Sequence, residues 1–249
     1  MPDSPGSSSK QRRDERFYWW QRKGKPTLVQ EWSDIGRREV NRFVEEVAAS
    51  RGRPGQRILD AAAGSAFYAL YFPDADYLTC DLRLREGEYD YSALDVACDV
   101  ARLPFRDSSF DTVLCTEALL HFLHPDQVLA EFHRVLGAGG WLALTAPFFG
   151  YHVLPFEHDY LRFTGHGIRR LLLESGFTVE RLTPVGGRFS AAATHLRRLV
   201  PLPLLRMMIN RLAMRLDRLF PDGGKYALTH LVVATKSPAA DRPPAAGPR

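Results

Sequence analysis

Cysteine is scarce in this chain and is not arranged for a disulfide framework or a metal site. Only three cysteines occur in 249 residues, at Cys80, Cys98 and Cys115. They are odd in number and form no C-x-x-C pair, which disfavours disulfide pairing and zinc binding. Cys80 and Cys115 fall in predicted buried strands, where a free cysteine acts as a small apolar residue. We therefore expect a reducing, cytoplasmic setting and no bound metal.

Long apolar runs are also missing. No stretch is long and apolar enough to span a bilayer, and residues 1–16 lack the apolar centre of a secretory signal. Residues 1–16 and 237–249 are rich in small, charged or proline residues, and we expect both segments to be disordered. The apolar fraction of 45% and the charged fraction of 25% are ordinary for a globular protein. The length suits one α/β domain with insertions.

Charge is unevenly distributed along the chain. Residues 26–194 carry 16 Lys and Arg against 23 Asp and Glu, whereas residues 1–25 carry seven against three and residues 195–225 seven against two. The body is therefore acidic, although the whole chain has a net charge of +4. An acidic body argues against a nucleic-acid partner, because phosphate backbones are bound by clustered basic side chains.

The stretch 57–70, RILDAAAGSAFYAL, is typical of a ligand-binding loop. Ile58 and Leu59 end a predicted buried strand, Asp60 closes it, and residues 61–66 are all small before an apolar, helix-compatible run. Small side chains let a ligand approach the backbone, and a helix N-terminus offers free N–H groups. A dinucleotide loop has the pattern G-x-G-x-x-G. Here an acid precedes the loop, which suits an ammonium or sulfonium better than a pyrophosphate.

A second predicted strand covers residues 76–82 and ends in Asp81, 21 positions after Asp60. In nucleotide-binding α/β folds, an acid at this place holds the ribose hydroxyl pair, because one carboxylate accepts both donors. The alternative is a solvated aspartate at a strand end.

Residues 97–147 contain three further predicted elements. The apolar pattern predicts a strand over 110–115, a helix over 125–136 ended by Gly137, Gly139 and Gly140, and a strand over 141–146. Further along, we expect a helix at 164–175 and strands at 177–183 and 228–235.

Three motifs resemble those of class I S-adenosylmethionine-dependent methyltransferases of the type 11-like branch. DAAAGSA at 60–66 is similar to D-x-G-x-G-x-G, with Ala62 and Ala66 in place of glycine and only Gly64 retained. DVARLPFRDSSFD at 99–111 and RVLGAGG at 134–140 match the later motifs closely. The resemblance covers residues 55–185. It implies a Rossmann-like seven-stranded sheet with helices on both faces and an antiparallel last strand.

The same resemblance implies S-adenosylmethionine as cofactor. Asp60 and Gly64 would hold its methionine part, Asp81 its ribose and Asp99 its adenine, while Thr116 and Glu117 would line the junction with the acceptor. The predicted cofactor-binding residues are Asp60, Ala61, Ala62, Gly64, Ala66, Asp81, Leu82, Asp99, Val100, Thr116 and Glu117.

Residues 147–164, PFFGYHVLPFEHDYLRFT, follow the fifth strand, where α/β sheets bind ligands. They resemble an H-x-x-P…D-x-x-R-[FY]-T segment found in related enzymes from bacterial glycan, lipid or secondary-metabolite contexts. Histidine is a plausible general base, and arginine could hold a carboxylate or phosphate. We predict His152 and His158 as catalytic candidates, and Tyr151, Asp159, Arg162 and His121 as substrate-binding residues. The alternative is a loop pinned by an Asp159–Arg162 pair, with His121 structural.

Residues 186–226 form an insertion before the last strand. A helix is predicted over 203–220, with apolar residues on one stripe and arginines interspersed. We expect this stripe to pack on the body; a wall over the substrate or a basic face for anionic lipid is the alternative. Aromatic residues 17–20 are expected to anchor the N-terminal arm or to form a lid. Residues 17–236 are thus predicted to be one domain, with a core at 37–185.

The resulting hypothesis is methyl transfer to an oxygen or nitrogen of a small-molecule, glycan or lipid-linked acceptor, by a monomer or homodimer. One alternative is a methyltransferase-like binding or regulatory protein whose loop has degenerated. A nicotinamide oxidoreductase is disfavoured by the loop. A nucleic-acid methyltransferase is disfavoured by the acidic body and by the lack of an N/D-P-P-[FY] motif.

Overall fold

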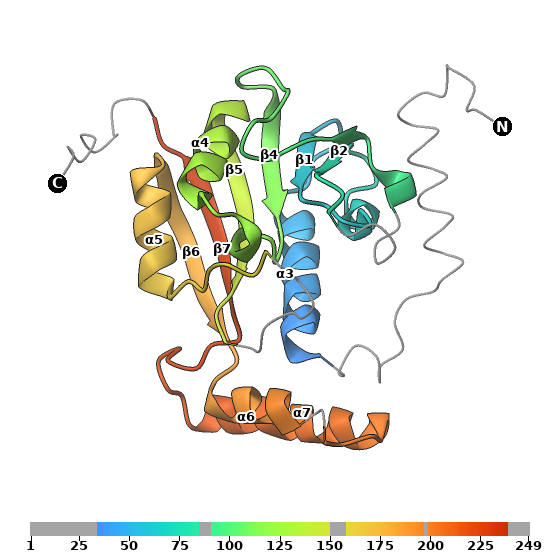
Figure 1. Ribbon diagram of the computed structural model, residues 1–249, viewed down its shortest axis with the longest axis vertical. Helices are drawn as coiled ribbons and strands as arrows, with labels where there is room; N and C mark the ends of the chain where they lie inside the picture. Colours follow the sequence, from blue (N-terminus) through green and yellow to red (C-terminus); the bar gives the residue numbers. More distant parts are fainter. Residues whose placement is uncertain (1–33, 85–90, 150–157, 197–198, 239–249) are drawn as a thin grey trace.

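The computed structural model describes residues 34–84, 91–149, 158–196 and 199–238, and its centre is one seven-stranded sheet (Figure 1). The strand order is β3-β2-β1-β4-β5-β7-β6. β7 runs antiparallel to both neighbours, β5 and β6, whereas the other pairings are parallel. The predicted sheet with a reversed last strand is therefore confirmed. The strands are β1 Arg57–Ala61, β2 Asp76–Asp81, β3 Val96–Ala97, β4 Phe110–Cys115, β5 Leu136–Pro147, β6 Phe177–Val185 and β7 Thr229–Lys236.

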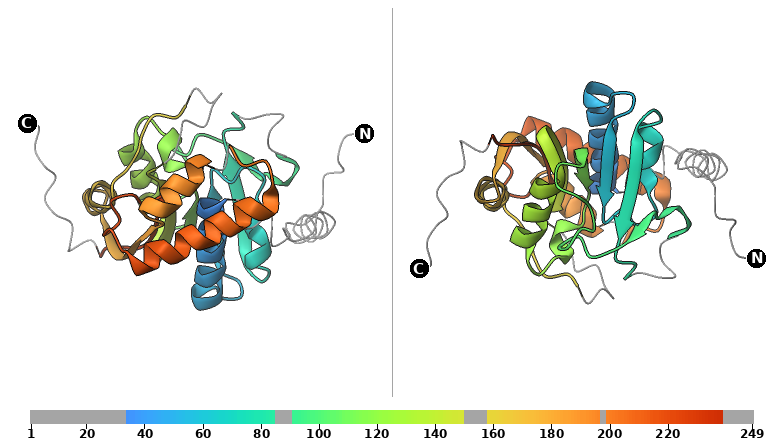
Figure 2. Two further views of the ribbon diagram at one scale, coloured as in Figure 1. Left: turned by 90° about the horizontal axis from the view of Figure 1, so that it is seen from below. Right: turned by 90° about the horizontal axis from the view of Figure 1, so that it is seen from above.

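Helices cover both faces of the sheet (Figures 1 and 2). On one face, α3 (Ile35–Arg51) buries Val40, Phe43 and Val44 beside the short 3₁₀ helix η1 (Phe67–Tyr71). On the other face, α4 (Pro125–Val135) and α5 (Gly165–Glu174) bury Phe132 and Leu172. Burying apolar side chains on both faces is what makes the central strands continuous apolar runs. Two further 3₁₀ helices, η2 (Tyr91–Ala93) and η3 (Leu119–His121), lie in the loops.

The run that follows the small-residue loop differs from the expectation. Instead of a longer helix, it forms only the five-residue 3₁₀ helix η1, which ends before Phe72. Phe72 precedes Pro73, and the residue before a proline is driven out of the α conformation by a steric clash. A helix this short contributes little dipole, so the loop's own conformation has to shape any ligand site here.

The end of α4 also differs from the expectation. The helix stops at Val135, because Leu136 adopts an extended backbone (φ −71°, ψ 136°) and pairs with Phe110 of β4. The glycines predicted to end the helix therefore lie within β5. Gly139 has a φ of +70°, which glycine adopts without steric cost.

The insertion forms a separate layer at the carboxyl edge of the sheet. Pro147, at the end of β5, and Val185, at the end of β6, both pair with Thr229, the first residue of β7. The chain leaves the sheet at this edge and forms α6 (Arg188–Leu196) and α7 (Pro203–Leu219) before it returns. Viewed from below, the two helices lie across the end of the sheet (Figure 2, left). Within the described residues, no helix is long and apolar enough to cross a membrane.

The face of α7 that packs is not the predicted apolar stripe. Asn210 and Ala213 are buried, whereas Met208, Leu212 and Leu219 are 63%, 57% and 70% exposed. The expectation that the stripe packs on the body was therefore wrong. The reason lies in α6, whose buried residues are all small, namely Ser190, Ala191 and Ala193.

Asp217 fixes the orientation of α7 against α6. Its carboxylate accepts hydrogen bonds from the backbone N–H groups of Phe189 at 2.9 Å and Ser190 at 3.0 Å, in the first turn of α6. The approach is close enough to require glycine at position 187, where a Cβ would lie 2.7 Å from an Asp217 oxygen. Capping of this kind satisfies N–H groups that have no partner within the helix.

We expect Asp217→Ala to lower the free energy of unfolding by about 1–2 kcal/mol, because two helix N–H groups lose their acceptor. Amide hydrogen exchange should show the loss of protection concentrated in α6. Glu45→Ala, at an exposed position of α3, is the matched control and should change neither quantity. Unchanged protection of α6 in the Asp217 variant would contradict this account.

Candidate active site

The small-residue loop between β1 and η1 is tied to the end of β2. The Asp81 carboxylate accepts a hydrogen bond from the backbone N–H of Gly64 at 3.0 Å and another from that of Arg83 at 2.7 Å. The Ala63 N–H also bonds to the Cys80 carbonyl at 3.1 Å. These bonds bring Asp60, the loop and Asp81 together at the carboxyl edge of the sheet, as the sequence predicted.

Both alanines that replace glycine in the loop have a left-handed backbone. Ala62 has a φ of +58° and Ala66 a φ of +54°. For an L-residue with a Cβ, this conformation costs about 1–2 kcal/mol. Ala61, by contrast, lies in β1 and is fully buried. The loop thus keeps its shape without the usual glycines and stores strain.

Asp60 is buried, and one of its oxygens lacks a partner. The side chain is 1% exposed, and Oδ2 accepts a hydrogen bond from the Tyr77 hydroxyl at 2.7 Å. Among the residues that the structure describes, Oδ1 has no hydrogen-bond partner. Burial raises the pKa of Asp60 from its ordinary 3.8 to about 7; the Tyr77 bond lowers this pKa and the charge of Asp81 raises it. A bound cation would remove this penalty.

The predicted adenine-binding turn follows directly at the end of β3. Cys98 N–H bonds to the Asp81 carbonyl, and the exposed Asp99 carboxylate accepts the Ala101 N–H at 2.9 Å. Val100 is buried beneath this turn, whereas Leu82, at the end of β2, is 51% exposed. The turn therefore lies beside Asp81.

Glu117 occupies the junction of three strands. It follows β4 and has a strained φ of +53°. One carboxylate oxygen accepts hydrogen bonds from the hydroxyls of Thr145 on β5, at 3.0 Å, and Thr229 on β7, at 2.9 Å. Burial raises the pKa of Glu117, and the opposing charge of Arg37 on α3 lowers it. Thr116, next to it, is partly buried. Strained backbone at such a place is typical of functional sites.

The segment before α5 docks onto η3 at the same edge. The backbone N–H groups of Tyr160 and Leu161 bond to the Leu120 carbonyl, and a ring nitrogen of His121 bonds to the His158 carbonyl at 2.8 Å. His121 therefore has a structural contact, because its ring holds the backbone of the segment before α5 at His158. The ring of His158 bonds to the Tyr160 hydroxyl at 2.7 Å, so Asp159 does not orient it through that nitrogen.

Asp159 pairs with Arg162 instead. The side chain of Asp159 is 3% exposed, and its carboxylate accepts two hydrogen bonds from the guanidinium, one of them at 2.7 Å. Asp159 raises the pKa of Arg162, and the charge of Glu117 adds to this effect. Arg162 therefore lies within electrostatic range of Glu117. Tyr151 and His152, as well as the aromatic residues 17–20, lie outside the described residues.

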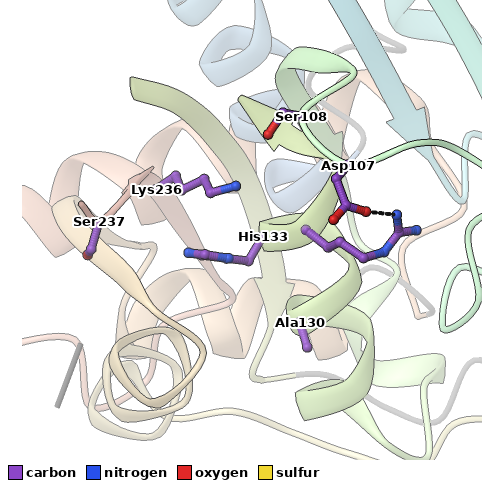
Figure 3. Close-up of a pocket in the computed structure, with 7 residues that line it drawn as sticks. Asp107, Ser108, Ala130, His133, Lys236 and Ser237 are labelled. Atoms are coloured by element: carbon purple, nitrogen blue, oxygen red, sulfur yellow. Dashed lines mark hydrogen bonds and ion pairs between the residues drawn. The ribbon is translucent and has the colours of Figure 1, made fainter. Parts of the chain in front are cut away.

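A cavity of about 280 Å³ lies at the opposite end of the sheet (Figure 3). It is lined by Asp107, Ser108, Ala130, His133, Arg134, Lys236 and Ser237, around the end of α4 and the end of β7. None of the predicted site residues is among them. Because open α/β sheets bind ligands beyond the carboxyl ends of their strands, the Asp60–Glu117 edge remains the candidate active site.

Three polar residues of the site were missed by sequence reasoning. Tyr77, Thr145 and Thr229 supply the hydroxyls that bind Asp60 and Glu117. Thr145 sits in the apolar strand run WLALTAP, where an isolated polar residue is a usable signal, whereas Thr229 begins the run THLVVAT beside His230 and is not isolated. Tyr77 offered no such signal, because aromatic residues are common in strands.

Comparison with known proteins agrees with this geometry. Residues 59–144 match the family model described as "Methyltransferase domain". This part of the chain is therefore similar to a methyltransferase domain. The demethylmenaquinone methyltransferase of Streptomyces avermitilis is 37% identical over 112 residues, which cover 43% of this chain and 46% of that protein. The phthiotriol/phenolphthiotriol dimycocerosates methyltransferase 1 of Mycobacterium ulcerans is 34% identical over 128 residues, 47% of each.

Solved structures share the architecture of the methyltransferase domain. The crystal structure of the [4+2]-cyclase SpnF superposes with a TM-score of 0.53 at 19% sequence identity, covering 79% of this chain and 80% of that one. This similarity concerns the fold alone. The chain spans about half the length of the curated relatives it matches.

Relief of the loop strain gives a direct test. We expect Ala62→Gly and Ala66→Gly each to raise the free energy of unfolding by about 0.5–1 kcal/mol. Glycine relieves the strain of the left-handed backbone in the folded protein, and its greater conformational freedom in the unfolded chain offsets part of that gain. Urea unfolding measures the change. Ala63→Gly, in the same loop without a left-handed backbone, is the matched control and should destabilise the protein. Destabilisation by all three would refute the strain assignment.

The buried carboxyl of Asp60 gives a second prediction. Because its folded pKa of about 7 exceeds the unfolded value of 3.8, its contribution to stability declines as pH rises through that window. Asp60→Asn removes this titration. We expect the stability of the variant relative to the natural protein to grow by about 3 kcal/mol between pH 5 and pH 8, in cofactor-free urea unfolding. Parallel pH curves for the two proteins would show that Asp60 is not buried in this way.

Proposed function

We propose that this methyltransferase domain transfers a methyl group from S-adenosylmethionine to an oxygen or nitrogen of a small-molecule, glycan or lipid-linked acceptor. The observation that carries the proposal is the buried Asp60 carboxyl, with one oxygen unpartnered among the described residues, beside a loop of small residues. A buried carboxylate in this state needs a cation, and S-adenosylmethionine carries two, an ammonium and a sulfonium.

The residues present suit the other parts of the cofactor as well. Each Asp81 oxygen accepts one backbone N–H and keeps a lone pair for a ribose hydroxyl. Asp99 keeps its second oxygen for the adenine amino group. The proposed roles of Asp60, Asp81 and Asp99 therefore agree with the hydrogen-bonding capacity that each leaves unused among the described residues.

The cofactor supplies a methyl group on an already reactive sulfonium, so this chain has to align the acceptor and exclude water. Glu117 and the Asp159–Arg162 pair are assigned to the acceptor side, since the charge of Glu117 acts on Arg162. Arg162 can hold an anionic group of the acceptor. His158 is the proposed base among the described residues, because an imidazole can accept the proton of a hydroxyl or amine acceptor.

The names of the relatives indicate a quinone and a phthiotriol derivative as their acceptors. A hydrophobic or lipid-linked acceptor for this chain is supported by these names and by the helical layer over the same edge. The fold alone does not decide the reaction, since a [4+2]-cyclase shares it. The strained alanines of the loop support one alternative function, that of a methyltransferase-like binding protein without catalytic turnover.

Calorimetric titration with S-adenosylmethionine and S-adenosylhomocysteine tests the proposal. We expect micromolar binding by the natural protein and at least a hundredfold loss in Asp60→Asn. Asp74→Asn, an exposed position at the opposite edge, is the control and should bind normally. Acceptors can then be screened by transfer of a labelled methyl group.

Failure of both ligands to bind folded protein would reject the proposal. If the Ala62→Gly/Ala66→Gly double variant alone acquired binding, the natural chain would be the non-catalytic relative.

A further inference from the structure

Exposed apolar side chains are concentrated in the helical layer. Of the fifteen large apolar side chains that are exposed in the described residues, ten lie within 196–226. Isolated exposed leucines are ordinary, whereas a contiguous group marks an interaction surface.

Five of these exposed residues form one stripe along α7. Leu204, Leu205, Met208, Leu212 and Leu219 are spaced so that they share one side of the helix, and each is exposed. Asn210 and Ala213 occupy the opposite, buried side. The stripe therefore points away from the body, and we call these five residues the α7 stripe.

A basic edge runs along the α7 stripe. Arg211, Arg215 and Arg218 are exposed and recur at helical spacing beside it. The two acidic residues of the layer, Asp217 and Asp222, are engaged by backbone N–H groups of α6 and the following turn. The solvent side of α7 is thus apolar and cationic.

We propose that the α7 stripe and its basic edge dock this protein onto an anionic lipid surface. A helix that combines an apolar stripe with arginines lies in the plane of a bilayer interface, with its apolar side chains among the acyl chains and its cations at the headgroups. Each basic residue near such a surface adds to the attraction.

Charge disfavours two other partners that could cover the α7 stripe, namely the N-terminal arm and a second copy of the chain. The N-terminal arm is itself cationic, since residues 1–25 carry seven Lys and Arg against three Asp and Glu. Two copies that pack through the α7 stripe would place their arginine edges near each other, where like charges repel. An anionic bilayer satisfies both the apolar stripe and the arginines.

Docking in this way turns the candidate active site toward the bilayer. The helical layer emerges from the carboxyl edge of the sheet (Figure 1). Asp60, near the end of β1, and Glu117, after the end of β4, lie at the same edge. Access to a lipid-linked acceptor is the part of the inference that rests on the proposed function. Docking itself does not depend on it.

Co-sedimentation of the full chain with vesicles tests the inference. We expect binding to equimolar phosphatidylglycerol and phosphatidylcholine, at least tenfold weaker binding to phosphatidylcholine alone, and a comparable loss in high salt. Arg215→Glu/Arg218→Glu and, separately, Met208→Gln/Leu212→Gln should each weaken binding at least tenfold. Arg53→Glu/Arg106→Glu, at the opposite edge of the sheet, and Leu173→Gln, on α5, are the controls and should bind as the natural protein does.

Two results would overturn docking through α7. One is vesicle binding that the α7 variants leave unchanged, which would assign it to another segment. The other is no vesicle binding together with a concentration-dependent dimer that Leu212→Gln dissociates, which would assign the face to a second copy. Cofactor titration of the same variants separates the two proposals: vesicle binding without S-adenosylmethionine binding would leave docking intact and reject the proposed function.

Discussion

A buried carboxyl group is the constraint on which the rest of the site depends. Asp60 is the last residue but one of β1 and is buried, and among the described residues only the Tyr77 hydroxyl donates a hydrogen bond to it. Ionising it in the cofactor-free protein costs on the order of 4 kcal/mol relative to the unfolded chain, a sizeable part of the stability of an ordinary domain. Such a cost is retained where a ligand of opposite charge offsets it. The sheet, the loop and Asp81 hold the group in place.

Backbone strain adds to this cost at the same edge. Five non-glycine residues in the described part of the chain have a positive φ, and four of them lie at the candidate site, namely Ala62, Ala66, Arg83 and Glu117. Each strained residue has support nearby: Asp81 binds the loop and the amide of Arg83, and two threonines bind Glu117. Backbone strain thus lowers the stability of the fold at this edge, and apolar burial on the two faces of the sheet offsets the loss.

The positions of the strands could be predicted well from the sequence, whereas the side chains that contact one another across strands and helices could not. Apolar runs located every long strand, because both faces of this sheet are buried. The pairing of Asp60 with Tyr77 depends on parallel register between β1 and β2, where Ile58 lies beside Tyr77, and no local pattern encodes that register. The apolar periodicity of α7 predicted a helix correctly, but periodicity does not determine which side of a helix packs against its neighbour. Asp217, by capping α6, decides this. Pro73 shortens the helix after the loop, and a proline of this kind is readable in the sequence as a helix boundary.

The charge distribution gives the molecule an orientation as well as a docking surface. Residues 26–194 are net acidic, with 16 basic and 23 acidic side chains, whereas residues 195–225 carry seven basic and two acidic ones. An anionic surface therefore attracts the helical layer and repels the body, so the encounter is steered before any apolar contact forms. Because the layer leaves and re-enters the sheet at its carboxyl edge, the orientation that charge favours is also the one that brings the candidate active site nearest the lipid. One insertion between β6 and β7 thereby links the location of the protein to the direction from which an acceptor arrives.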